Sequence, residues 1–196
     1  GPGTLHAVAD VYPHEQDMTR FTTKSLNTSL EDHEIELVAT RECPGKVICT
    51  EREIELTIKH TERFSYLKGK DLVLKADEEE ISLNERDYSN SYDMNSKAKD
   101  GTDGVLKEKF LIWVSESDFR KAAYAKTAIM NVGGDSFELS YEGRDNWQIM
   151  LDRERLLEIM DDEQQREYGQ YPHEKKNIKE ITIQEKRMSS EAEEST

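Results

Sequence analysis

The sequence lacks the features that mark membrane-spanning and nucleic-acid-binding proteins. None of its apolar runs approaches the roughly 18 residues that a bilayer-spanning helix needs. Lysine and arginine total 27 against 42 aspartates and glutamates, and no basic cluster rises above this acidic background. Because a phosphate-binding surface requires concentrated positive charge, we expect no nucleic-acid partner and no attraction to an anionic membrane. The net charge of −15 is typical of a well-solvated surface.

Motifs of the common catalytic and metal sites are also missing. The sequence contains no Gly-x-Ser-x-Gly elbow, no phosphate-binding glycine-rich loop and no His-Glu-x-x-His. The nearest approach to a metal-ligand cluster is His14, Glu15 and Asp17, for which an exposed polar turn is the favoured interpretation. Residues 100–103 lack the alternating ligands of an EF-hand, so weak calcium binding there is the alternative to an ordinary turn. We therefore predict no catalytic residue, cofactor or metal.

Only two cysteines are present, Cys43 and Cys49, and their surroundings are informative. They are too far apart for a Cys-x-x-Cys redox site, and no histidine follows at zinc-finger spacing. Alternating strands are expected before them, at 34–39, and after them, at 53–58, with a Pro-Gly turn signal between. An antiparallel connection would bring the cysteines within disulfide reach, and two free thiols are the alternative. A disulfide would place the protein outside the reducing cytosol.

The remaining pattern is rich in strands. Two hairpins are expected, one joining 72–76 to 81–83 and one joining 127–132 to 136–141. Residues 110–114 are apolar on both faces, which predicts a central strand covered on each side. The polar stretch 84–104 reads as a long surface loop.

Two helices are expected. Ser115 is a candidate N-cap for a helix over 116–126 that buries three residues on one face, namely Phe119, Ala122 and Ala123. A second helix is expected from Asp145 to about residue 167, because apolar residues recur there at helical spacing. Residues 178–183 could add one edge strand.

These elements predict an α+β fold: an antiparallel, strand-rich sheet or small β-sandwich with two packed helices and a flexible C-terminal tail. Gly1-Pro2-Gly3 is typical of the remnant of a cleaved expression tag and is excluded from fold reasoning. Residues 4–167 are expected to form a single domain. Residues 168–196 are expected to be an extended, largely disordered acidic tail.

Several blocks of the sequence follow one another in a distinctive order. The first is an alternating strand that runs into Arg41-Glu42-Cys43-Pro44-Gly45 and is followed by Cys49. A second strand at 54–58, the hairpin at 72–83 and the Ser115 helix start follow it. From residue 34 to residue 151 this order resembles a loosely defined group of bacterial exported proteins, some of them lipoproteins. The resemblance implies export and a Cys43–Cys49 pair; the group carries no assigned activity, so no site residue follows from it.

The leading functional hypothesis is a non-catalytic extracytoplasmic binding or structural module of the periplasm or cell envelope. Its partner would be a protein or an envelope component, held by the 84–104 segment or an exposed sheet edge. A lipid anchor upstream of residue 4 is compatible with this hypothesis. One alternative is a hydrolase-type enzyme whose acidic residues converge only in the fold. The other is a cytosolic acidic interaction protein or inhibitor, which would carry free thiols.

Overall fold

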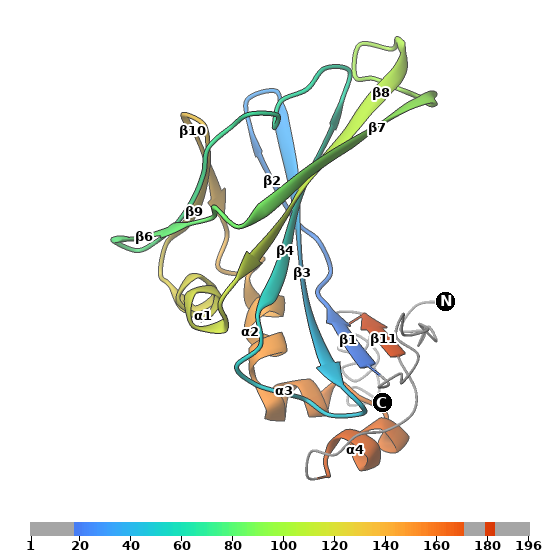
Figure 1. The fold of residues 1–196 in the computed structure, drawn as a ribbon, viewed down its shortest axis with the longest axis vertical. Coiled ribbons are helices and arrows are strands. Elements are labelled where there is room, and N and C mark those ends of the chain that lie inside the picture. Colours follow the sequence, from blue (N-terminus) through green and yellow to red (C-terminus); the bar gives the residue numbers. More distant parts are fainter. Residues whose placement is uncertain (1–17, 171–178, 183–196) are drawn as a thin grey trace.

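The chain folds into two β-sheets with helices packed beside them (Figure 1). The structure is a computed structural model that describes residues 18–170 and 179–182. Within those ranges the strands far outnumber the helices, and nearly all neighbouring strands run antiparallel. The α+β fold class expected from the sequence is confirmed.

The larger sheet has seven strands. Its order is β11 (Lys179–Thr182), β1 (Met18–Thr22), β3 (His33–Pro44), β4 (Ile54–Glu62), β8 (Asp103–Val114) and β7 (Arg86–Lys97), with β2 (Leu26–Leu30) also paired to β3. The short strands β1 and β2 pair with successive halves of the long strand β3. Only β11 pairs in parallel, with β1. It lies within the segment expected as a tail, and it confirms the edge strand that was expected over 178–183.

The β3–β4 pair shows why this sheet forms where it does. Side chains at alternate positions of both strands are fully buried, as the sequence pattern predicted: Ile35, Leu37, Ala39, Ile54, Leu56 and Ile58. The register sets Leu37 opposite Ile58 and Ala39 opposite Leu56, so apolar side chains face one another across the strands. The alternate positions on the opposite face carry the polar residues, and they remain partly exposed.

The smaller sheet consists of the two predicted hairpins. Its order is β10 (Asp135–Leu139), β9 (Ala128–Val132), β5 (Leu72–Ala76) and β6 (Glu79–Ser82). Gly133 makes the β9–β10 turn possible, because its φ of 62° is a conformation that side chains disfavour. A Cβ there would also lie 2.9 Å from the Lys70 side chain.

The first helix begins and packs as predicted. In α1 (Glu116–Tyr124) the Ser115 hydroxyl accepts a hydrogen bond from the Asp118 N–H at 3.1 Å, and the three expected residues are buried. The Phe119 ring lies 4.8 Å, centre to centre, from Trp147 of α2 (Asp145–Leu151). Arg41 of β3, almost fully buried, ties both helices to the sheet through Glu116 at 3.2 Å and the Met150 carbonyl at 2.7 Å.

The single helix expected from Asp145 to residue 167 is wrong. The segment instead forms α2, α3 (Arg153–Glu158) and α4 (Asp162–Tyr168). Asp152 is extended and caps α3 by accepting from the N–H groups of Glu154 and Arg155. Asp161 caps α4 in a reciprocal capping box with Gln164. These two aspartates end one helix and start the next because their carboxylates compete for backbone N–H groups.

The loop expected at 84–104 is also wrong. Most of it is β7, which forms a twelve-residue edge strand, and a short turn then leads into β8. The interpretation failed because β7 is exposed along most of its length, so it has no apolar alternation to reveal it. The covering expected on both faces of 110–114 is only partly present. Phe110, Ile112 and Val114 are buried, whereas Leu111 and Trp113 remain half-buried.

The two cysteines form a disulfide that ties the end of β3 to the loop before β4. The sulfur atoms of Cys43 and Cys49 lie 2.05 Å apart, with their Cα atoms 5.6 Å apart. Cys43 is fully buried in the core, and no free cysteine remains. The bridge therefore holds the β3–β4 connection close to the end of β3.

We predict that unreduced, denatured protein contains no titratable thiol and that reduction exposes two. Replacing both cysteines, C43A with C49A, should lower the free energy of unfolding by about 2 kcal/mol, because a short cross-linked loop is released. Urea unfolding measures the loss. Reductant should reproduce it in the wild-type chain and have no effect on the double variant; two thiols in the unreduced chain would contradict the bridge.

Candidate functional site

A buried carboxylate, Glu108, lies at the centre of the molecule. On β8 it points to the same face as the core residues Phe110 and Ile112, and across the sheet it lies directly opposite His60 of β4. Its side chain is completely inaccessible to solvent, and His60 is only 3% exposed. A charged group at such a position requires strong compensation.

Five hydrogen-bond donors surround this carboxylate. One oxygen accepts from His60 Nδ1 at 2.9 Å and from the backbone N–H groups of Tyr66 and Leu67, the latter at 3.0 Å. The other accepts from the hydroxyls of Ser65 at 2.8 Å and Tyr88 at 2.7 Å. Burial by itself raises the pKa of Glu108, but the donated hydrogen bonds outweigh it and hold the pKa below its ordinary value. The group is therefore ionised.

The same contacts hold the two sheets together. Ser65, Tyr66 and Leu67 belong to the segment that crosses from β4 in the larger sheet to β5 in the smaller one. The Tyr66 ring stacks on His33, with the ring centres 3.8 Å apart, and the Tyr66 hydroxyl donates to Asp135 of β10. Burial and the hydrogen bond to Asp135 both raise the pKa of Tyr66. Tyr66 is thus held by two carboxylates, Glu108 at its backbone N–H and Asp135 at its hydroxyl.

The His60–Glu108 pair resembles the orienting half of a hydrolytic triad, in which a carboxylate holds a histidine. A triad also needs a nucleophile within hydrogen-bond reach of the histidine. Within residues 18–170, however, no serine, threonine or cysteine side chain bonds to His60, and Ser65 donates to Glu108 instead. The pair stabilises the fold, and it gives the hydrolase hypothesis no support.

The described residues also hold no metal cluster: no three His, Cys, Asp or Glu side chains gather there. The Asp100 carboxylate at the β7–β8 turn accepts hydrogen bonds from Thr102 and Arg63, as in an ordinary turn. The other candidate, His14 with Glu15 and Asp17, lies outside the described residues. Within the described ranges, no helix has the length and apolar character that crossing a membrane requires.

The side of β7 that faces away from β8 is a second candidate site. Among the described strands β7 pairs only with β8. The N–H of Trp113 donates to the carbonyl of Glu85 at 3.0 Å, so these two residues form a hydrogen-bonded pair at the start of the β7–β8 ladder. In an antiparallel ladder, pairs that bond to each other alternate with pairs that do not. In that alternation the backbone N–H and C=O groups of four residues point away from β8: Arg86, Tyr88, Asn90 and Tyr92.

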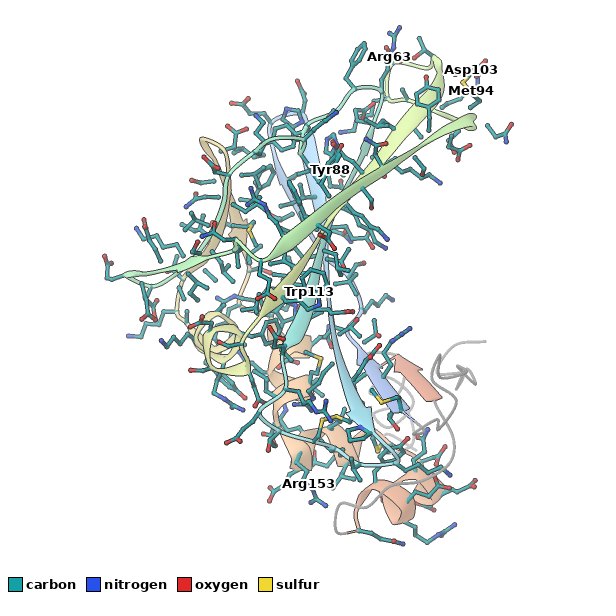
Figure 2. All side chains as sticks on the ribbon, in the orientation of Figure 1. Arg63, Tyr88, Met94, Asp103, Trp113 and Arg153 are labelled. Atoms are coloured by element: carbon teal, nitrogen blue, oxygen red, sulfur yellow. A yellow bond between two sulfur atoms is a disulfide. The ribbon has the colours of Figure 1, made fainter. Side chains whose placement is uncertain are left out.

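Exposed apolar side chains gather near this edge. The described chain has five large apolar side chains that are strongly exposed, and three of them are Tyr92 at 56%, Met94 at 61% and Phe64 at 71%. Phe64 belongs here because its neighbour Arg63 bonds to Asp100 in the hairpin turn. Figure 2 shows Arg63, Met94 and Asp103 at the same end of the molecule. Such clustering is typical of an interaction surface.

A shallow hollow of about 400 Å³ lies on the outer face of the same hairpin. Its lining includes three lysines, Lys59 of β4 with Lys107 and Lys109 of β8, and the small β7 residues Ser89 and Ser91. This is a local concentration of positive charge in a chain of net charge −15.

The comparisons with known proteins found no matching family model, no matching curated protein and no matching solved structure. Function must therefore be argued from the geometry alone. The sequence contained one signal for the buried centre: Glu108 has the same parity as Phe110 and Ile112, which places it on the core face.

We predict that E108Q lowers the free energy of unfolding by about 3 kcal/mol. The amide removes the charge and keeps only one oxygen, so its NH2 group must face either the Tyr66 and Leu67 N–H groups or the hydroxyls of Ser65 and Tyr88, which now donate to the carboxylate. The matched control is E62Q. The partly exposed Glu62 carboxylate accepts from the N–H groups of Arg63 and Lys99 at 3.1 and 3.3 Å and lies 3.9 Å from the Lys99 ammonium. An amide oxygen can keep both N–H bonds, so E62Q should lose less than about 1 kcal/mol. Equal losses in urea unfolding would show that Glu108 is an ordinary surface-like acid.

Stability should fall as the pH drops below about 6.5, the usual value for histidine. Burial is the main cause that lowers the pKa of His60. The nearby Glu108 carboxylate raises this pKa and His33 lowers it further, and the net shift is downward. The folded state therefore binds fewer protons than the unfolded state in this range, and acid favours unfolding. In H60Q the slope of unfolding free energy against pH between 7 and 5 should become shallower; an unchanged slope would contradict this assignment.

Proposed function

We propose that this protein is a non-catalytic extracytoplasmic binding module that holds an extended segment of a partner protein along the edge of β7. The observation that carries the proposal is the twelve-residue edge strand with outward backbone groups. Adding a strand to such an edge provides main-chain hydrogen bonds for affinity and alternate side-chain contacts for specificity.

The middle of β7 lacks the devices that usually protect an edge strand. Proteins block exposed edges with proline, charged side chains or bulges. Residues 88–92 contain no proline and no charged residue. The irregularity in the ladder begins only after Asp93. The open stretch is therefore long enough for five residues of an incoming strand.

The compartment is supported by the disulfide. A Cys43–Cys49 bridge persists in the periplasm or at the cell surface and is rare in a reducing cytosol. A binding partner in the cell envelope is consistent with this, and so is the exposed apolar cluster near β7. Free thiols in the isolated protein would remove this support and favour a cytosolic interaction protein.

The test uses peptides selected from a random display library against the full, disulfide-intact chain. We expect selected peptides to protect the amides of Arg86, Tyr88, Asn90 and Tyr92 from hydrogen exchange. N90P removes one outward N–H without breaking the ladder to β8. Its affinity for the selected peptides should fall at least about tenfold, which is the net contribution of one main-chain hydrogen bond.

N90A is the matched control, because it removes the same side chain and keeps the N–H. It should bind the peptides much more tightly than N90P does, because the outward N–H is retained, and the two variants should have similar melting temperatures. If the selected peptides protect other regions, or bind N90P unchanged, β7 is not the binding edge and the proposal fails.

A further inference from the structure

We infer that the segment held by β7 alternates acidic and apolar residues, with a carboxylate over Lys109 and its apolar side chains on the side of Tyr92. This inference rests on the proposed function and names the chemistry of the partner. It follows from the two different faces that β7 and its neighbours present.

The register of the hairpin assigns the β7 side chains to these faces. Tyr88 lies opposite Phe110, and the two rings pack edge to face at 5.3 Å on the inner side. Ser89 and Ser91 lie opposite Lys109 and Lys107 on the outer side. A strand added to β7 would follow the same alternation, so every second side chain would lie beside one of these serines.

The outer side carries positive charge that the fold itself does not need. Lys59 lies directly opposite Lys109 across the β4–β8 ladder, and like charges so placed are destabilising. Within the described ranges neither lysine forms an ion pair. Lys107 does, with Asp93 at 3.2 Å. Lys59 also faces Glu36 across the β3–β4 ladder, so Lys109 is the lysine whose charge the described fold leaves uncompensated, as is typical of a functional surface.

The serines make these lysines accessible from the edge. Neighbouring strands lie about 5 Å apart, so an added strand would lie about 10 Å from β8. A lysine of β8 and a glutamate of the added strand can meet across this gap only if the β7 side chain between them is small. Ser89 and Ser91 meet that condition, and the hollow extends over both of them.

Nearby acids limit where the carboxylates can bind. Glu36 of β3 lies opposite Lys59, and Asp87 and Asp93 flank the open stretch 88–92 of β7 on the same side as Ser89 and Ser91. The positive charge is therefore concentrated at Lys109, beside the middle of the edge. This favours one or two carboxylates at alternate positions over a continuous acidic run.

The inner side selects against charge. Tyr92, Asn90 and the ring of Tyr88 form the inner margin of the edge, and Tyr92 is 56% exposed. The Tyr92 ring covers Gly104, whose φ of 97° and close approach leave no room for a side chain. Apolar residues of an added strand would continue this aromatic surface.

The test compares three capped ten-residue peptides in which isoleucine alternates with glutamate, with lysine or with threonine. Binding to the full chain is measured by calorimetry, and its location by hydrogen exchange. The glutamate peptide should bind at least about tenfold more tightly than the lysine peptide and protect the outward amides of β7. K109E should reverse that order, whereas K24E, at an exposed lysine between β1 and β2, should leave it unchanged.

The outcomes separate the two proposals. If all three peptides protect β7 equally, the charge preference is wrong and strand addition at β7 stands. If no peptide protects β7, both proposals fail. Sedimentation of the chain alone is the third arm: dimers that N90P abolishes and N90A retains would make a second copy the occupant and would overturn the inference. Melting temperatures of all variants confirm that each is folded.

Discussion

The ionised carboxylate of Glu108 is the contact on which the arrangement of both sheets depends. It lies on the core face of the larger sheet and accepts hydrogen bonds from the backbone N–H groups of Tyr66 and Leu67, in the connection to the smaller sheet. Apolar packing would hold two sheets together at many relative positions, because it is not directional. Hydrogen bonds to a single buried charge select one of these positions.

The same carboxylate reaches the outer strand. Tyr88 of β7 donates to Glu108 at 2.7 Å, and Asn90 in turn donates to the Tyr88 hydroxyl at 3.3 Å. The edge strand is therefore anchored to the core at its inner face, while no described strand pairs with its outward backbone groups. An edge that is both rigid and unpaired loses little conformational freedom when a partner strand is added.

Sequence patterns predicted the helices and strands in which buried apolar residues recur at a regular spacing along one face. The alternation in β3 and β4, the Ser115 cap and the two short hairpins all depend on neighbouring residues, so they could be identified locally. The single helix over 145–167 was wrong because Asp152 and Asp161 act as caps, and β7 was missed because an exposed edge strand has no apolar period. Glu108 was missed for another reason: its five donors come from three separate segments, and only the fold brings them together.

Within the described residues the edge strands of the larger sheet differ greatly in length: β7 has twelve residues, whereas β11 and β2 on the opposite side have four and five. Filaments of stacked sheets require one edge of each molecule to match the opposite edge of the next. The described residues of β11, or those of β2, could match less than half of β7, so head-to-tail pairing through either strand would leave most of the long edge uncovered. A β7–β7 pair would instead cover the whole edge and would be closed and symmetric. An open strand at β7 therefore favours a closed pair over a growing filament.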